Sequence, residues 1–472
     1  MDYTNFVKKN FINRVEELNA LIQRINSNKA EFIIVYGKRR VGKTELLLQL
    51  LKVNKNILYY IFRNENEVMQ LKRLSEILAE KINDEYLLSN PFFNWDSFFK
   101  YIKNKDFILI FDEFPNAVIS NQSLPSIFQE YWDLHLKNTK TKIILCGSSI
   151  KMMESLLGYK SPIYGRRTAQ FLIEPLKFKH AQLFFGNISK EEKIIYYSIL
   201  GGTPTYLLEF DFSKKVDENI LSILKKDSFL FNEVNFILRE ELNEPRTYFS
   251  ILSEISKGKT KISELINSTG LDKTTIIRYL SILIDLHLVE RKLPFNESIN
   301  SRKGIYVLKD NFFRFWFRFI FQKLELLQQN NQEAVLKYIK ENLNQFVSFS
   351  FEEICKDYLR AHYEIVNSWW HKDKEIDIIA IKEQNEKQEI LFGECKWQNS
   401  LVDTDVYYEL KEKSKFVNYK REDREKEKNK NKEKSNKITE KFALFSKSGF
   451  TKKMKELAKK ENVLLYELND IL

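Results

Sequence analysis

Two glycines, a lysine and a threonine occur at a spacing that suits the binding of a phosphate chain. They lie in GKRRVGKT, residues 37–44, where four residues separate Gly37 from Gly42 and Lys43-Thr44 follows at once. Glycines let the backbone wrap around phosphates, so that the loop amides and the start of the next helix face the anion. The lysine reaches the β- and γ-phosphates, and the threonine holds Mg²⁺. We expect nucleotide to bind along this loop: Gly37, Lys38, Arg39, Arg40, Val41, Gly42, Lys43 and Thr44.

Two neighbouring carboxylates, Asp112 and Glu113, come directly after an apolar stretch at 106–111. A strand that is apolar on both faces is typical of a parallel sheet, in which the carboxyl ends of the strands face the ligand. At that edge Asp112 would bind Mg²⁺, and Glu113 would polarise the attacking water. Together with the glycine loop, these residues predict ATP and Mg²⁺ as cofactors and ATP hydrolysis as the reaction.

Three more polar residues are weaker candidates for the same site. Ser148 follows the apolar stretch 141–147 and could contact the γ-phosphate, although a turn of small residues explains it equally well. Arg166 and Arg167, in PIYGRRT, could include an arginine finger that acts in the same chain or in a neighbouring one. Paired surface arginines are the ordinary alternative.

The elements needed to position these residues alternate between strand and helix. The apolar run Phe32–Tyr36 leads into the glycine loop, and a helical leucine pattern follows it as far as Leu50. The segments 106–111 and 141–147 are typical of two further buried strands. This alternation indicates an α/β domain with a parallel sheet.

Six motifs in order give the first half of the chain a family resemblance. FINRVEEL (11–18), GKRRVGKT, LIFDEF, LCGSS, YGRRT and GGTPTYL resemble the archaeal-type P-loop ATPases, which are close to the AAA+ and STAND groups. The resemblance covers roughly residues 5–240 and implies an ATP-binding α/β domain with a helical lid. It also implies that Phe11–Leu18 lies near the adenine and that the Gly202-Thr203-Pro204 segment closes the lid, which makes Pro204 a nucleotide-binding residue.

A second set of charged residues lies near the C-terminus, in LFGECKW at 391–397. Glu394 and Lys396 are two apart on an apolar strand, so they point the same way, and buried charges are costly unless they pair or bind something. The segment 368–397 predicts a hairpin that brings Asp377 beside Glu394. Carboxylates suit Mg²⁺ or Mn²⁺, and such an ion beside a lysine can activate water and stabilise a phosphoryl transition state.

This D…ExK arrangement resembles the PD-(D/E)xK nuclease superfamily. The resemblance implies that Asp377 and Glu394 bind metal and that Lys396 is the catalytic lysine. An upstream helix with two glutamates near its start would supply a third metal carboxylate, for which Glu352 is a better match than Glu353. A domain with a WW pair, an EID strand and an ECKW strand typically follows the archaeal-type ATPase, which extends the resemblance to the end of the chain.

Two alternatives stay open for this C-terminal part. Nuclease folds are often kept without activity, so that the domain could have the fold and cut nothing. A glutamate–lysine pair on a sheet surface, with Asp377 unrelated to it, would give the same short pattern by chance.

Between these parts, the sequence from Arg246 to Leu308 predicts three helices followed by two strands around a polar tip, as in a winged helix. The exposed face of the third helix would then contact duplex DNA. An interdomain arm with no nucleic-acid contact is the alternative. The residues expected on that face and in the wing are Lys273, Thr274, Thr275, Arg278, Tyr279, Arg302 and Lys303.

The composition agrees with a polyanionic partner and a reducing compartment. The chain has 472 residues and a formal net charge of +11, which favours nucleic acid, with DNA preferred over RNA, although a lysine-rich surface without a partner is the plain alternative. Three scattered cysteines argue against a disulfide framework. The longest apolar run, 312–321, is interrupted by arginines and too short to span a bilayer, so we expect a buried core helix, no membrane partner and a cytoplasmic protein.

We predict an α/β P-loop sheet with a helical lid, then a winged helix-turn-helix, then an α/β nuclease-like (restriction-endonuclease-like) domain. The corresponding ranges are 1–170 for the ATPase core, 171–240 for the lid, 241–310 for the winged helix and 311–472 for the last domain. A charged insertion without apolar residues occupies 420–437.

The sequence supports two functions of different classes. In the first, ATP binding and hydrolysis gate a nucleic-acid-directed output, namely Mg²⁺-dependent phosphodiester cleavage. In the second, the chain is a STAND-like nucleotide switch whose C-terminal domain binds a partner without cleavage. A homo-oligomer or a protein partner is compatible with either function.

Overall fold

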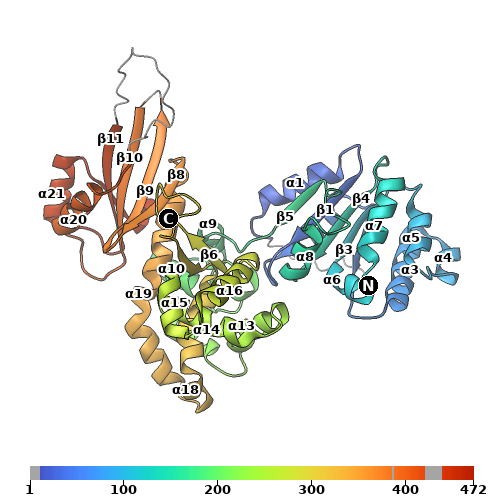
Figure 1. Ribbon diagram of the computed structural model, residues 1–472, viewed down its shortest axis with the longest axis horizontal. Helices are drawn as coiled ribbons and strands as arrows, with labels where there is room; N and C mark the ends of the chain where they lie inside the picture. The colour runs from blue at the N-terminus through green and yellow to red at the C-terminus, as the bar shows by residue number, and fades with distance from the viewer. Residues whose placement is uncertain (1–10, 385–386, 420–437) are drawn as a thin grey trace. The chain divides into compact units, whose positions relative to one another are not determined.

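The computed structural model describes residues 11–384, 387–419 and 438–472 (Figure 1). The predicted charged insertion at 420–437 lies outside these residues. The chain forms two compact units. The first holds Met1–Leu183, Gly202–Glu209 and Phe236–Asn243, and the second holds Phe184–Gly201, Phe210–Asn235 and Glu244–Leu472. The segment predicted as a lid is thus shared between the two units, and the four-part division of the chain stays a prediction.

The first unit is built on a five-stranded sheet of order β2-β3-β4-β1-β5, in which every pair of neighbours is parallel. This confirms the α/β class and the parallel sheet. Its strands are β1 (Glu31–Tyr36), β2 (Ile57–Ile61), β3 (Ile108–Asp112), β4 (Lys142–Gly147) and β5 (Ala169–Leu172).

Helices lie on both faces of this sheet, as Figure 1 shows. A helix follows directly on the glycine loop after β1, as the leucine pattern predicted. The helices and helical turns of this unit are α1 (Val15–Ile25), α2 (Lys43–Val53), α3 (Glu67–Ile82), α4 (Glu85–Ser89), α5 (Trp95–Ile102), α6 (Phe114–Ser120), α7 (Leu124–Tyr131), η2 (Trp132–Leu136), α8 (Ile150–Leu157), α9 (Phe178–Ala181), α11 (Pro204–Leu207) and the end of α13 (Phe229–Glu241).

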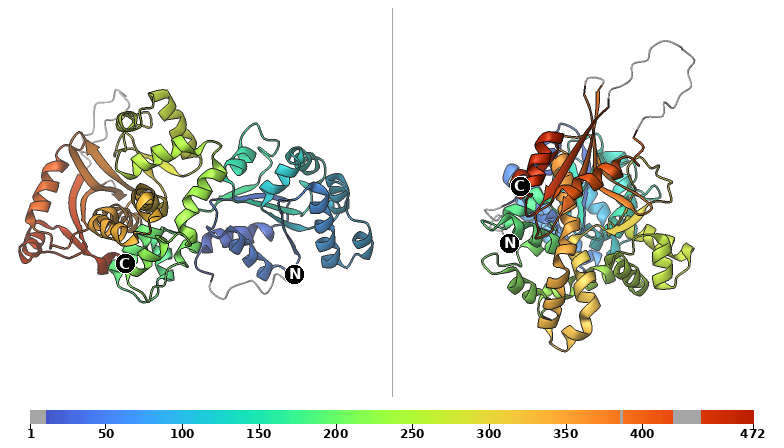
Figure 2. Two further views of the ribbon diagram at one scale, coloured as in Figure 1. Left: turned by 90° about the horizontal axis from the view of Figure 1, so that it is seen from below. Right: turned by 90° about the vertical axis from the view of Figure 1, so that its left-hand side faces the viewer.

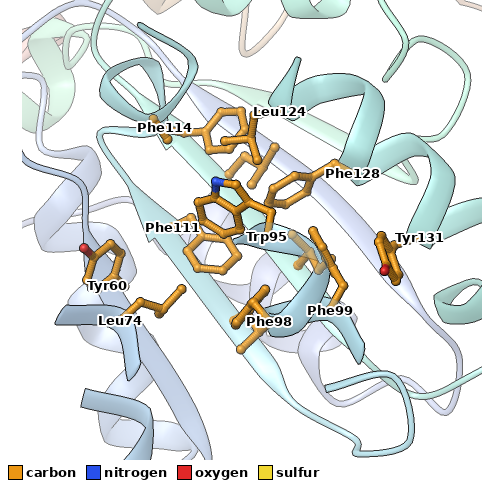
Figure 3. Close-up of a cluster of buried hydrophobic side chains, with 14 of the residues drawn as sticks. Tyr60, Leu74, Trp95, Phe98, Phe99, Phe111, Phe114, Leu124, Phe128 and Tyr131 are labelled. Atoms are coloured by element: carbon orange, nitrogen blue, oxygen red, sulfur yellow. The ribbon is translucent and has the colours of Figure 1, made fainter. Parts of the chain in front are cut away.

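Two apolar clusters hold these layers together, one on each face of the sheet. The larger is rich in aromatic side chains, among them Trp95, Phe99 and Phe128 (Figure 3). Phe99 meets Phe128 edge to face with ring centroids 4.9 Å apart, a geometry that aromatic quadrupoles favour. Burial of this surface fixes β3, and so the position of Asp112 at its end.

The second unit begins with a helical part that contains a small hairpin. The strands β6 (Val289–Lys292) and β7 (Ile305–Leu308) pair antiparallel after the three helices expected in this region. The elements are α10 (Lys190–Leu200), α12 (Val216–Ile223), α14 (Pro245–Ser256), α15 (Ile262–Thr269), α16 (Lys273–Asp285), α17 (Asn311–Phe315), η4 (Trp316–Ile320), η5 (Phe321–Lys323), α18 (Leu324–Gln328) and α19 (Gln332–Leu359).

The aromatic run at 312–321 forms α17 and the π-helical turn η4, and most of its side chains are buried. The expected core helix is therefore confirmed. Within the described part of the chain, none of the helices is both long and apolar enough to cross a membrane.

The rest of the second unit is a five-stranded mixed sheet of order β12-β11-β10-β9-β8. The strands β8 (Ile365–His371), β9 (Lys374–Gln384) and β10 (Lys387–Lys396) pair antiparallel, whereas β10, β11 (Ile438–Ser446) and β12 (Leu464–Glu467) run parallel. The helices α20 (Thr404–Ser414) and α21 (Lys452–Glu461) lie to one side of this sheet, as Figure 1 and the left view of Figure 2 show, and α22 (Leu468–Ile471) ends the chain.

The predicted hairpin is confirmed by the pairing of β9 with β10. Gly393 lies opposite Ile378, so Asp377 comes level with Glu394. The upstream helix differs from the prediction, because α19 begins at Gln332 and carries Glu352 and Glu353 in its last turns rather than near its start.

Candidate functional site

The glycine loop joins β1 to α2 in a conformation that two of its glycines require. Gly37 has φ +153°, and a Cβ there would lie 2.3 Å from the carbonyl oxygen of Ile173. Gly42, just before α2, has φ +94°, which lies in the region that side chains disfavour. The loop therefore curves tightly at the carboxyl end of β1 and presents the first turn of α2.

Lys43 reaches back across this loop. Its buried Nζ donates hydrogen bonds to the carbonyl oxygens of Gly37, at 2.8 Å, and Lys38, at 3.0 Å. Burial lowers the pKa of Lys43, although Cys146 and the carboxylates of Glu113 and Asp112 act in the opposite direction. A buried ammonium held inside the curve of the loop is suited to bind an anion, because its charge is poorly screened by water.

The predicted Mg²⁺ ligands meet each other. Thr44 Oγ1 donates to Asp112 Oδ2 at 2.8 Å, and the hydroxyl of Tyr59 donates to the same oxygen at 2.6 Å. Burial raises the pKa of Tyr59, so its hydroxyl remains a donor. The hydroxyl and the carboxylate supply the oxygen ligands that Mg²⁺ prefers, so the two residues fit the ion.

The predicted water-polarising residue and the γ-phosphate candidate also meet. Ser148 Oγ lies 2.9 Å from Glu113 Oε2 and donates to this carboxylate. Glu113 has φ +52°, a left-handed conformation that turns the chain between β3 and α6 (Phe114–Ser120). This contact positions the carboxylate at the edge of the sheet where the loop and Asp112 also lie.

The segment that contains Pro204 lies against the loop. A Cβ at Gly42 would come 3.9 Å from Pro204 Cγ. The ring of Tyr206 is 5.4 Å from Lys38 Nζ, and Thr205 Oγ1 donates to the carbonyl oxygen of Arg40 at 3.5 Å. The segment therefore contacts the loop, and its role in closing a lid over the nucleotide stays a prediction.

The arginine candidates have other partners. Arg166 forms an ion pair with Asp133 at 3.1 Å, and Arg167 donates to the carbonyl oxygen of Leu157 at 3.3 Å. Arg39, within the loop, pairs with Glu240 at 2.5 Å. An arginine finger at Arg166 or Arg167 therefore stays a prediction.

Two residues that the sequence analysis did not single out also shape this site. Buried Arg14 donates to the carbonyl oxygens of Val41, at 3.1 Å, and Glu174, at 2.5 Å, and so ties the first segment to the loop. Glu241 accepts a hydrogen bond from the amide of Ile150, at 3.1 Å, at the start of α8. Neither contact has a signal in the spacing of residues, since each joins segments far apart in the sequence.

In the second unit, three of the predicted residues gather at one end of the β9–β10 hairpin. Asp377 Oδ2 accepts from the amide of Cys395 at 2.8 Å, and Lys396 Nζ donates to Glu394 Oε1 at 2.9 Å. Lys413, from α20, donates to the same Glu394 oxygen at 3.5 Å. The other oxygen, Glu394 Oε2, is buried and has no hydrogen-bond partner among the described residues.

The pKa values of the two upstream glutamates, Glu352 and Glu353, shift in opposite directions. Burial and then the charge of Asp377 raise the pKa of Glu352 to about 8. Burial and then the charge of Glu394 raise the pKa of Asp377 to about 7. Burial would also raise the pKa of Glu353, but Lys356 and Lys292 lower it to about 2. Glu352 therefore interacts with the carboxylate cluster, whereas Glu353 forms ion pairs with lysines at 2.8 and 3.1 Å.

The cluster is not a ready-made metal centre. Across residues 11–384, 387–419 and 438–472, no group of three or more histidine, cysteine, aspartate or glutamate side chains is arranged to hold a metal ion. The unpartnered oxygen of Glu394 and the raised pKa of Asp377 fit a divalent cation chemically, because a cation would stabilise both carboxylates. Metal binding here stays a prediction.

The predicted nucleic-acid face on α16 is partly free. Lys273, Thr274 and Arg278 are exposed. The other two residues are half-buried: Thr275 donates to Asp272 at 2.6 Å in the helix cap, and Tyr279 packs on Tyr248 with centroids 4.5 Å apart. In the β6–β7 hairpin Lys303 pairs with Glu297 at 2.5 Å, while Arg302 is exposed.

The fold and the loop geometry of the first unit define a P-loop ATPase domain. Residues 11–210 match a family described as an ATPase domain predominantly from Archaea, and residues 191–308 and 316–411 match two domains of unknown function. An uncharacterized protein of Methanocaldococcus jannaschii is 39% identical over 422 residues, which cover 86% of this chain and 92% of that protein. The chain belongs to this archaeal P-loop ATPase family.

Two more distant similarities agree with this. An uncharacterized ATP-binding protein of Methanocaldococcus jannaschii is 26% identical over 304 residues, 60% of this chain and 76% of that protein. Among solved structures, a Walker-type ATPase of Pyrococcus abyssi has a TM-score of 0.50 and 19% identity, covering 66% of this chain and 97% of that chain. The likeness to this structure shows the fold.

Proposed function

We propose that the chain hydrolyses ATP in its first unit and that the nucleotide state gates a Mg²⁺-dependent nuclease in its second unit. In the first unit Lys43 would bind the β- and γ-phosphates, Thr44 and Asp112 would hold Mg²⁺, and Glu113 would orient the attacking water. The hydrogen bonds that already join Thr44 to Asp112 and Ser148 to Glu113 support these roles.

The observation that carries the nuclease is the unpartnered oxygen of Glu394. A buried carboxylate oxygen without a partner costs free energy, and a bound cation would remove that cost. Asp377 and Glu394 would hold the ion, with Glu352 nearby, and Lys396 would act on the water or on the phosphate. Besides burial, the charge of Glu394 raises the pKa of Asp377 and the charge of Asp377 raises the pKa of Glu352, which supports a shared ion.

Nucleic acid is the substrate that these features suit, with DNA favoured over RNA. The order of three helices and a hairpin over α14–β7 resembles a winged helix, and Lys273 and Arg278 are exposed on its third helix. The mixed sheet that presents Asp377 and Glu394 resembles the PD-(D/E)xK core. The net charge of +11 favours contact with a phosphate backbone.

Cleavage assays test the proposal directly. Purified full-length protein would be incubated with labelled duplex, single-stranded and branched DNA and with RNA, in Mg²⁺ or Mn²⁺, with and without ATP. We expect Lys396→Ala to abolish cleavage and Lys43→Ala to abolish its response to ATP. Lys382→Ala is the matched control, because this lysine also pairs with a glutamate on the same hairpin and is exposed to 34%, against 32% for Lys396. Cleavage that persists in Lys396→Ala would refute the assignment.

A second function is favoured by the absence of a ready-made three-ligand metal group from the described residues. In this alternative the chain is a STAND-like nucleotide switch whose second unit binds a partner and cuts nothing. The discriminating measurement is single-turnover ATP hydrolysis. Turnover slow enough to leave the protein loaded with nucleotide, with no cleavage of any substrate, supports the switch; turnover stimulated by DNA supports the nuclease.

A further inference from the structure

A cavity in the second unit combines positive charges with amide groups. It has a volume of about 210 Å³ and lies between the end of α14, the π-helical turn after α17, and α19. Lys257, Arg314 and Arg318 line it together with Asn342 and Gln345. Its described lining contains no aspartate or glutamate, but Lys257 is paired with Glu254 at 2.6 Å, so the positive charge that it presents comes mainly from the two arginines.

Arg314 is the unusual member of this lining. It is only 8% exposed, yet its Nε and Nη1 are buried without a hydrogen-bond partner in the described part of the chain. Nη2 donates to Ser350 Oγ at 2.8 Å and to the carbonyl oxygen of Phe346 at 3.3 Å. A buried guanidinium with two unused donor atoms is costly. Both atoms are enclosed, so the guanidinium has to turn toward the cavity before an anion there can satisfy them.

Packing accounts for only part of this arrangement. The guanidinium lies between two rings of α19, 4.4 Å from the centroid of Phe346 and 4.2 Å from that of Phe349. Ring faces interact with the face of a guanidinium and leave the N–H groups at its edge unsatisfied. If the arginine had a purely structural role, we would expect these N–H groups to donate hydrogen bonds to carbonyl or carboxylate oxygens.

The surrounding charges keep this arginine a cation. Burial lowers the pKa of Arg314 to about 9, while the charges of Glu352 and Glu353 act in the opposite direction. Neither glutamate lines the cavity. Arg318 follows one helical turn later and lines it too, so two guanidinium groups border the same space.

We propose that this cavity binds a small phosphate anion, either free phosphate or the phosphate group of a small phosphorylated molecule. The volume is below the roughly 300 Å³ at which pockets for larger ligands begin. Forked N–H donors from arginine match phosphate oxygens, and the amides of Asn342 and Gln345 can donate further hydrogen bonds. The proposal is independent of the proposed nuclease.

Isothermal titration calorimetry on the full-length protein tests it. The protein would first be saturated with Mg²⁺ and ADP to fill the P-loop, and then titrated with inorganic phosphate, pyrophosphate or AMP. We expect one additional site, weakened at least about tenfold in Arg318→Gln because a charged hydrogen-bond donor is lost. Lys337→Gln, which removes an exposed charge from α19 outside the cavity, should leave the affinity unchanged.

The three titrants separate the possible sources of the phosphate. Binding of inorganic phosphate supports a free ion, whereas binding of AMP alone supports a phosphate monoester. Heat from none of the three, or equal affinity in wild type and Arg318→Gln, would overturn the proposal.

Amide hydrogen exchange shows where on the protein the phosphate binds. Phosphate should slow exchange of the amides at 342–350 in wild type and not in Arg318→Gln. Arg314→Lys is the second variant, since it keeps the charge while removing the forked donors, and circular dichroism would verify that it folds. Protection confined to the P-loop would show that phosphate binds there only, which would overturn the proposal.

Discussion

The glycine-loop site of the first unit and the carboxylate cluster of the second differ in how far the protein itself satisfies their charged groups. In the first, Asp112 accepts hydrogen bonds from Thr44 and Tyr59, and Glu113 accepts one from Ser148. In the second, Glu394 keeps a buried oxygen without a partner among the described residues, and the pKa of Asp377 is raised to about 7. The first site is therefore pre-organised, whereas the protein satisfies the charged groups of the second only in part.

The largest effect should come from removing the ammonium of the first site. Lys43→Ala is expected to reduce ATP turnover by about a hundredfold or more, because it removes the charge that faces the phosphates. Phosphate release measured at saturating ATP and Mg²⁺ gives the result. Lys52→Ala, on the exposed part of the same helix, is the control and should keep wild-type turnover. Equal rates for both variants would contradict the assignment of the site.

The second prediction concerns the cost of breaking a pre-organised site. Asp112→Ala leaves the buried hydroxyl of Tyr59 without its acceptor, so we expect the free energy of unfolding to fall by about 2–4 kcal/mol. Urea denaturation followed by tryptophan fluorescence measures it. Adding Tyr59→Phe removes the stranded donor and should recover part of the loss; no recovery would mean that this hydrogen bond is not the cause.

In the carboxylate cluster, by contrast, we expect a substitution to change metal binding more than stability. Glu394→Gln is expected to weaken Mn²⁺ binding by about tenfold while changing the free energy of unfolding by less than about 1 kcal/mol, since Lys396 and Lys413 can both turn to water. Mn²⁺ binding would be followed by electron paramagnetic resonance without nucleotide. Glu389→Gln, on the same strand but paired with Lys441, is the control. A large loss of stability with unchanged Mn²⁺ binding would make Glu394 a structural residue.

The two sites also differ in what their sequences could predict. The residues at 37–44 are consecutive, and Asp112 and Ser148 end neighbouring strands, so covalent spacing and the parallel sheet bring them together. The family resemblance placed the segment of Arg14 near the nucleotide, but the contacts of Arg14 and Glu241 themselves join segments far apart in the chain and have no signal in residue spacing.

In the second unit, hairpin pairing alone was enough to place Asp377 beside Glu394. The helix before it was expected to be short, although the absence of glycine and proline between Gln332 and Leu359 is the signal for one long helix. The two glutamates therefore stand in the last turns of a long helix, and their different roles depend on lysines that only the fold brings near.

The smallest effect should appear at Glu241, the carboxylate that accepts hydrogen bonds at the start of α8. Burial raises its pKa above the usual 4.5, although the amides of Lys151 and Ile150 act in the opposite direction. The folded state then binds the proton more tightly than the unfolded chain, so this contribution to stability is present below pH 4.5 and is lost as the pH rises through the folded pKa. Glu241→Gln cannot titrate and should lack this fall, a difference on the order of 1 kcal/mol.

Hydrogen exchange of the Ile150 amide between pH 4 and pH 7 measures this difference locally, after correction for the intrinsic pH dependence of exchange. Protection should decrease with pH in wild type and stay level in Glu241→Gln. Glu240→Gln is the control, because its side chain is 42% exposed and pairs with Arg39 rather than with α8. If the protection of the Ile150 amide depended on pH in the same way in wild type and Glu241→Gln, the Glu241 carboxylate would not be titrating in this range. Glu241 would then hold α8 with a permanent charge.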